Sequence, residues 1–147
     1  MALALMQSES HIVVVDARPE DYHDLACLAG ERQWHVHLLT TARAAITFNG
    51  RARADLWFIN ACLPEMSGFA LCEILEGQVR RGPAFIISDQ YEPEHERLAC
   101  QCGVAYLAKS PGHSIDCRWL LQLLANRNSD QGFARWGGPT SRLASAG

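Results

Sequence analysis

Polar residues follow several apolar runs of this chain at points where a buried strand would end. They are Asp16, Thr40, Asn60, Ser88 and Lys109. The stretch FINACLPEMSG, residues 58–68, has the pattern of a strand end, a loop and a helix start. Such a turn would hold a reactive carboxylate at the strand tip, but the residue there is Asn60, a neutral amide. The sequence therefore resembles a reactive site in which the reactive group is missing.

The segments that would position these residues alternate between strands and helices. Predicted strands cover residues 11–17, 34–40, 54–60, 83–89 and 104–110, and predicted helices cover 18–33, 41–50, 67–81, 92–102 and 114–127. Asn49–Gly50 is expected to stop the second helix, and Gly103 to follow the fourth. Five such repeats predict an α/β fold with a parallel sheet covered by helices on both faces. Ligands of such sheets bind at the carboxyl ends of the strands, so the polar strand ends should lie together.

Composition is that of one globular domain. The chain has 147 residues, 48% of them hydrophobic and 20% charged, which is enough apolar sequence for a core. A formal charge of −3 without a basic block argues against a dedicated nucleic-acid surface. The start, MALALMQSES, is too short to span a membrane and has no charged front, so we expect a cytoplasmic protein without a membrane segment. Residues 1–9 are interpreted as an extension, 10–127 as the domain and 128–147 as a flexible tail or linker.

The cysteines and histidines give only weak signals of metal or redox chemistry. Cys100 and Cys102 form a single C-x-C pair, so the six cysteines are best interpreted as inert thiols. Cys62, close to Asn60, is an alternative redox-sensing thiol. His35 and His37 share one face of a strand and would need further ligands to hold a metal, so an exposed strand face is favoured.

Several spaced motifs together resemble the receiver domain of bacterial two-component response regulators, the CheY-like family, over residues 10–127. The motifs are VVVDARP, DLWFINACLPEMSGF, FIIS and YLAKSP. The resemblance implies a flavodoxin-like (βα)5 fold with five parallel strands. It also implies signal transduction through protein contact rather than an enzyme. No cofactor is expected, and Mg²⁺ binding is expected to be weak or absent.

Carried over residue by residue, the family pattern is incomplete. Asp16 takes the first acidic position of the family, but Ala17 takes the second, where an acid is expected. Asn60 takes the phosphoacceptor position, and Lys109 fits the family's lysine. Ser88 and Tyr106 fit the switch pair, a hydroxyl and an aromatic ring. Cys62 would place a main-chain carbonyl near the pocket. The resemblance therefore points to a degenerate receiver that lacks the phosphoacceptor aspartate.

The chemistry of these changes can be argued directly. Accepting a phosphoryl group needs an anionic oxygen nucleophile, which an asparagine amide does not provide. Mg²⁺ prefers carboxylate oxygens, so Asp16 and Asn60 would form at most a weak residual site. By this count Asp16 and Lys109 sum to zero charge, where the family pocket is near −2. We therefore hypothesise that Lys109 pairs with Asp16, or bonds Asn60, and closes the pocket without metal.

Two further interpretations concern the rim of this pocket. Asp89, next to Ser88, is expected to be a solvated loop acid rather than a contributor to the pocket. The Asp16–Lys109 pair is also compatible with a purely structural role.

The expected partners are proteins: a histidine kinase, an output domain or another regulator. By resemblance the contact surface is the fourth helix, the fifth strand and the fifth helix, which also allows a homodimer. One alternative is a phosphorelay receiver with a non-standard acceptor. Others are a thiol- or metal-sensing domain and a flavodoxin-like cofactor binder, although DARPED after the first strand offers no phosphate-cradling loop.

Overall fold

A computed structural model describes residues 10–78, 82–110, 115, 117, 119 and 120. Five strands form one parallel sheet in the order β2-β1-β3-β4-β5. The strands are β1 (His11–Val15), β2 (His35–Leu39), β3 (Leu56–Asn60), β4 (Ala84–Ser88) and β5 (Ala105–Ala108). Each lies within its predicted range, which confirms the predicted α/β class and parallel sheet.

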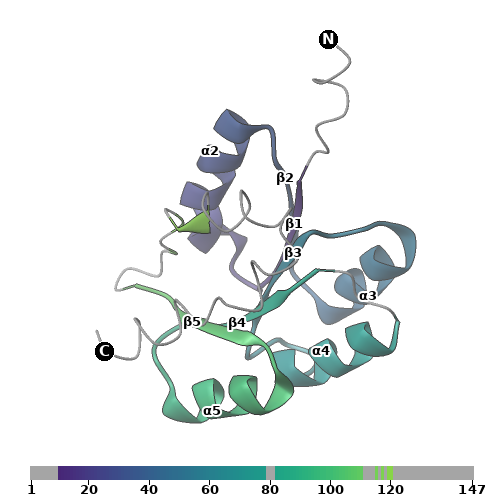
Figure 1. The fold of residues 1–147 in the computed structure, drawn as a ribbon, viewed down its shortest axis with the longest axis vertical. Helices are drawn as coiled ribbons and strands as arrows, with labels where there is room; N and C mark the ends of the chain where they lie inside the picture. The colour runs from purple at the N-terminus through teal and green to yellow at the C-terminus, as the bar shows by residue number, and fades with distance from the viewer. Residues whose placement is uncertain (1–9, 79–81, 111–114, 116, 118, 121–147) are drawn as a thin grey trace.

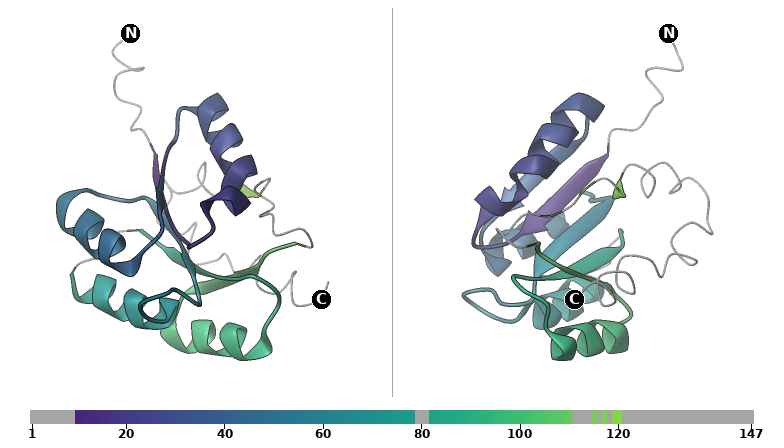
Figure 2. Two further views of the ribbon diagram at one scale, coloured as in Figure 1. Left: turned by 180° about the vertical axis from the view of Figure 1, so that it is seen from behind. Right: turned by 90° about the vertical axis from the view of Figure 1, so that its left-hand side faces the viewer.

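Helices cover both faces of the sheet, as predicted. A 3₁₀ turn, η1 (Pro19–Tyr22), leads into α2 (His23–Arg32), and these are followed by α3 (Ala42–Arg51), α4 (Gly68–Gly77) and α5 (Pro93–Cys102). Figure 1, and the view from behind in Figure 2, show α2 on one side of the sheet and α3, α4 and α5 on the other. The predicted last helix, the extension 1–9 and the tail 128–147 lie wholly or largely outside the described residues.

Two apolar cores follow from this layering, and the alternation of strand residues divides them. On the α3–α4–α5 side, Leu71 and Ala99 pack with Ile59 and Ile86. On the α2 side, Leu25 packs with Phe58 and its neighbours. β1, β3 and β4 are apolar on both faces because helices cover both. No helix in the described part of the chain is long and apolar enough to cross a membrane.

Helix ends follow local chemistry in most places. The side chains of Thr41 and Ser67 accept hydrogen bonds from main-chain N–H groups in the first turns of α3 and α4. Gly103 ends α5 in the left-handed region at φ 72°, as predicted. The predicted stop at Asn49–Gly50 is wrong: α3 continues to Arg51. Asn49 instead donates its amide to the Leu75 carbonyl and to Gln78, which ties α3 to α4.

Gly68 determines how closely α4 approaches the end of β3. Its N–H donates to the Ala61 carbonyl at 2.8 Å, and the residue is buried. A Cβ at this position would overlap the main-chain carbonyl of Asn60. A glycine is therefore required to hold the helix start against the strand tip that carries Asn60.

We predict that Gly68→Ala lowers the free energy of unfolding by about 1–3 kcal/mol, because the overlapping backbone atoms must move. Gly77→Ala is the matched control within the same helix, since a Cβ there meets no atom within 4 Å. That control is expected to leave stability unchanged or to raise it by up to about 1 kcal/mol. Urea denaturation measures both variants, and equal stabilities would contradict the role assigned to Gly68.

Candidate functional site

Four of the five predicted strand-end residues gather at the carboxyl edge of the sheet. Asp16 follows β1, Asn60 ends β3, Ser88 ends β4 and Lys109 follows β5. All four are buried, with 1–5% of their surface exposed. Buried polar groups must find partners, so the contacts that Asp16, Asn60 and Lys109 make define the site. The fifth, Thr40, follows β2 at the sheet edge and is exposed.

Lys109 is the centre of the site. Its Nζ lies 3.0 Å from Asp16 Oδ2, 2.8 Å from Asp21 Oδ2 and 2.8 Å from Asp89 Oδ1. The lysine side chain is completely buried, whereas that of Asp89 is 47% exposed. An ammonium group has three donors, and three carboxylates accept from it or pair with it here. Lys109 thus joins residues that follow β1, β4 and β5.

The Asp16 carboxylate is bonded through both oxygens. Its Oδ1 accepts from the Arg18 main-chain N–H at 2.9 Å. Its Oδ2 accepts from the Tyr22 hydroxyl and from Asn60 Nδ2, each at 2.9 Å. A buried carboxylate is tolerated only when its charge is paired and its lone pairs are occupied, and both conditions hold for Asp16.

Asn60 links the same carboxylates from the other side. Its Nδ2 donates to Asp16 Oδ2 at 2.9 Å and to Asp89 Oδ1 at 3.0 Å, while its Oδ1 accepts from the Cys62 N–H at 2.8 Å. Carboxylates only accept hydrogen bonds, so this bridge needs a side chain that donates. An aspartate at position 60 would turn like charge toward Asp16 and Asp89, and the network therefore favours the amide.

The structure corrects two expectations about the charge of this site. Asp89 is not simply a solvated loop acid, because it contacts both Lys109 and Asn60. The sum of zero charge was also wrong, since three carboxylates beside one ammonium leave a net charge of −2. The hypothesised contact between Lys109 and Asp16 is present. The sequence analysis did not include Asp21 in the site. It placed this residue in a predicted helix, which would not direct the side chain to the strand ends, whereas Asp21 lies in η1.

The remaining predicted residues take peripheral places. Ala17 and Cys62 are exposed, and Cys62 contributes its main-chain N–H to Asn60 rather than its thiol. Tyr106 is buried, and its hydroxyl accepts from the Glu92 N–H at 2.9 Å. Ser88 Oγ lies 2.7 Å from Nδ1 of His95, in the first turn of α5. The sequence carried no signal for this contact, because only the fold brings α5 against β4.

The charges of the network alter the titration of its members. Burial works to lower the pKa of Lys109, but its hydrogen bonds to Asp21, Asp89 and Asp16 outweigh burial and raise that pKa above 10.5. Burial likewise works to raise the pKa of Asp89, but hydrogen bonds from Lys109 and Asn60 hold it below 3.8. Burial, followed by the charge of Asp16, places the pKa of the Tyr22 hydroxyl well above its usual value. Across the pH range between these limits, Lys109 and Asp89 both stay charged in the fold.

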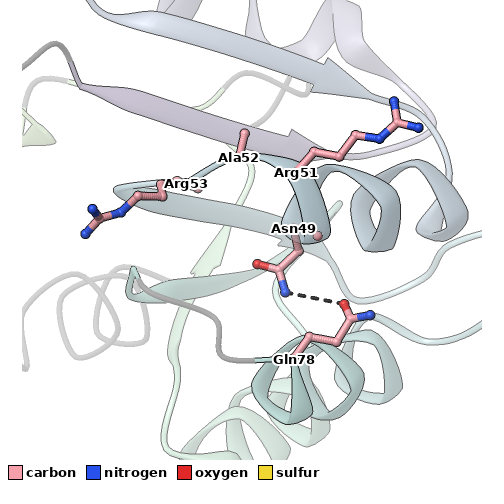
Figure 3. A pocket seen from close by; sticks show the side chains of 7 residues that line it. Asn49, Arg51, Ala52, Arg53 and Gln78 are labelled. Atoms are coloured by element: carbon pink, nitrogen blue, oxygen red, sulfur yellow. Dashed lines mark hydrogen bonds between the residues drawn. The ribbon is translucent and has the colours of Figure 1, made fainter.

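A separate hollow of about 260 Å³ lies at the other end of β3, before its first residue, and it is lined by residues 49–54 and Gln78. Figure 3 shows that Arg51 and Arg53 extend in different directions there. Among the described residues, no carboxylate lines this hollow, and none of its lining residues belongs to the lysine-centred network, which consists of Lys109, Asp16, Asp21, Asn60 and Asp89. It is therefore not part of the candidate site.

Comparison with known proteins was informative only for the fold. No protein-family model and no curated protein matches the sequence. A CheY-like receiver domain protein from Methanospirillum hungatei has 20% identity and a TM-score of 0.62, over 86% of this chain and 99% of its own. The fold is that of response regulator receiver domains.

Two further receiver-fold structures support the same assignment. Vibrio cholerae chemotaxis response regulator CheY4 has 18% identity and a TM-score of 0.65, over 81% of this chain and 98% of its own. A Burkholderia pseudomallei response regulator, solved with a phosphorylated aspartic acid, calcium ion and citrate, has 18% identity and a TM-score of 0.67. That match covers 86% of this chain and 74% of the other.

We predict that Lys109→Met lowers the free energy of unfolding at neutral pH by about 3–5 kcal/mol, because it leaves Asp16 and Asp21 without their buried counter-charge. Urea denaturation measures the change. Arg97→Met is the matched control, since Arg97 pairs with Glu94 on the exposed surface of α5. It removes the same charge and is expected to change stability little.

The pH dependence of the stability of Lys109→Met is a second test of the role of Lys109. Protonation removes the unpaired negative charges, so the stability difference from wild type should shrink as the pH falls through the carboxylate range. The wild type loses the contribution of Asp89 as the pH falls below 3.8. A difference that is small, or that does not depend on pH, would contradict the role assigned to the network.

Proposed function

We propose that this chain is a pseudo-receiver: a receiver-fold signalling domain that acts through protein contacts without phosphorylation of an aspartate. The observation that carries the proposal is the bridge from Asn60 to Asp16 and Asp89. In this arrangement the side chain at the tip of β3 serves as a hydrogen-bond donor to two carboxylates. An amide nitrogen has a delocalised lone pair and does not form an acyl phosphate.

Lys109 takes the place of a metal ion in this proposal. Two carboxylate oxygens that a Mg²⁺ ion could use are already bonded, since Asp16 Oδ2 and Asp89 Oδ1 each accept from Asn60 and contact Lys109. Among the residues that the structure describes, no group of three or more His, Cys, Asp or Glu side chains is arranged to hold a metal. The side chains as placed therefore do not fit Mg²⁺ beside Lys109, and the ammonium supplies the positive charge.

The rest of the fold suits a signalling domain in a fixed state. Tyr106 is buried against Tyr91 with its hydroxyl bonded to Glu92, and Ser88 is bonded to His95. These contacts tie the start of α5 to the end of β4 and to β5. We propose that α5, the fourth helix of the sequence analysis, and β5 belong to the surface that meets a protein partner in the cytoplasm. The homodimer through this face stays a prediction.

A phosphorelay receiver with a non-standard acceptor is the second candidate, and one observation indicates which residue it would use. Asp89 has the most exposed side chain among the carboxylates around Lys109, at 47%. Asp16 and Asp21 are 2% and 9% exposed and are less accessible to a phosphodonor. Asp89 is thus the acceptor that this alternative requires.

We predict that incubation with a small-molecule phosphodonor and Mg²⁺ leaves the intact mass of the protein unchanged, because the chain offers no aspartate at the tip of β3. Asn60→Asp, measured in parallel, shows whether the rest of the pocket supports phosphorylation. A stoichiometric phosphate adduct on the wild type would overturn the proposal. Loss of that adduct in Asp89→Asn would then establish the second candidate.

We also predict that Lys109→Met gains stabilisation by Mg²⁺, because removal of the ammonium leaves three carboxylates facing one another. Thermal unfolding with and without Mg²⁺ measures this effect. The wild type and Arg97→Met, which keeps the network intact, are expected to show no specific Mg²⁺ dependence. Tight, saturable Mg²⁺ binding by the wild type would show that Lys109 does not replace the metal.

A further inference from the structure

Three histidine side chains gather on β1 and β2. The parallel register pairs His11 with His35 and Val13 with His37, and alternate residues of a strand share a face. The ring of His11 stacks on His35 at 4.7 Å and on His37 at 5.4 Å between centroids. His11 Nδ1 and His37 Nε2 are 3.1 Å apart, within hydrogen-bonding distance. The sequence analysis noted only His35 and His37, because His11 joins them through strand pairing.

The surroundings of this histidine cluster, defined as His11, His35 and His37, favour a neutral ring at His37. From α3, the apolar ring of Phe48 packs on His37 at 4.7 Å. From the segment before β3, Asp55 is the nearby acid, and its Oδ2 accepts the main-chain N–H of His11 at 2.7 Å. Burial, followed by the charges of His11 and His35, lowers the pKa of His37 below 6.5.

The short contact between two rings makes the cluster sensitive to protons. A hydrogen bond between two imidazole nitrogens needs one donor and one acceptor. When both nitrogens carry a proton, two N–H groups and two positive charges face each other across about 3 Å. A fold that favours neutral His37 contributes stability that is complete above the ordinary histidine range and is lost as the pH falls through it.

The cluster connects to the lysine-centred network through β2. Among the described strands, β2 is at the edge of the sheet and pairs with β1 alone. Two residues after His37, the carbonyl of Leu39 accepts the main-chain N–H of Asp16 at 3.0 Å. A displacement of β2 along or away from β1 therefore acts on the residue that anchors Lys109 and Asn60.

We propose that the histidine cluster is a proton-sensitive element, in which mild acidification weakens the pairing of β2 with β1 and thereby shifts Asp16 and its network. This inference goes beyond the proposed function, since it concerns an input and does not depend on the absence of phosphorylation. The effect of the histidine cluster can be separated by pH from that of Asp89. Asp89 stays ionised while His37 changes its charge, because hydrogen bonds from Lys109 and Asn60, acting against burial, hold its pKa below 3.8.

The test is an NMR titration of the full-length protein from mildly alkaline to mildly acidic pH. The probes are the ring signals of the histidines, the Asp16 main-chain amide and the Asn60 side-chain amide. We expect the two amide signals to move with the same midpoint as the His37 ring. Hydrogen exchange, corrected for its intrinsic pH dependence, should show a loss of protection in β2 that is larger than in β4.

Variants assign the effect to the cluster. His37→Gln keeps a side chain able to bond His11 but cannot take a charge, so the coupled movement of Asp16 and Asn60 should disappear. His23→Gln, at the start of α2, is the matched control and should retain it. His11→Gln provides a second test if His37→Gln does not fold. Amide signals that stay fixed over the histidine range, or that move equally in His37→Gln, would overturn the proposal.

Discussion

The buried ammonium of Lys109 is the interaction on which the carboxyl edge of this sheet depends. It contacts three carboxylates that reach it from the segment after β1 and from the end of β4. A charge in such a position is costly unless it is paired, and each carboxylate near it is costly without the lysine. The charged residues therefore act as one unit, and the strand ends are held together by charge as well as by main-chain hydrogen bonds.

The carboxylates around Lys109 give a physical reason for an amide at position 60. Two carboxylates that face the tip of β3 need a donor there, and an amide donates to both without adding charge. Viewed by residue type alone, Ala17 and Asn60 suggest a pocket that has lost its acids. In the fold, Asp21 and Asp89 join Asp16 as carboxylates that contact the lysine. The charge of the site is therefore set by residues that the sequence pattern did not bring together.

Much of the fold was predictable because it rests on local or periodic signals. Apolar runs marked the five strands, and Gly103 marked the end of α5. The residues whose roles were predicted wrongly take those roles from contacts with residues distant in sequence. Asn49 and Gly50 did not stop α3, since Asn49 bonds α4 instead. Asp89 was assigned to solvent because exposure is usual for an aspartate, and its contact with Lys109 spans twenty residues.

The sequence by itself determined the parallel α/β class, the strand ends and the amide at position 60, because periodicity and residue chemistry are visible without coordinates. Only the tertiary structure decided the charge of the site and the partners of its residues. Asp21 reaches Lys109 across 88 positions of the chain, and His11 meets His35 and His37 through strand register. Such contacts arise where strands and turns converge, and no local pattern encodes the distance between two side chains that the fold brings together.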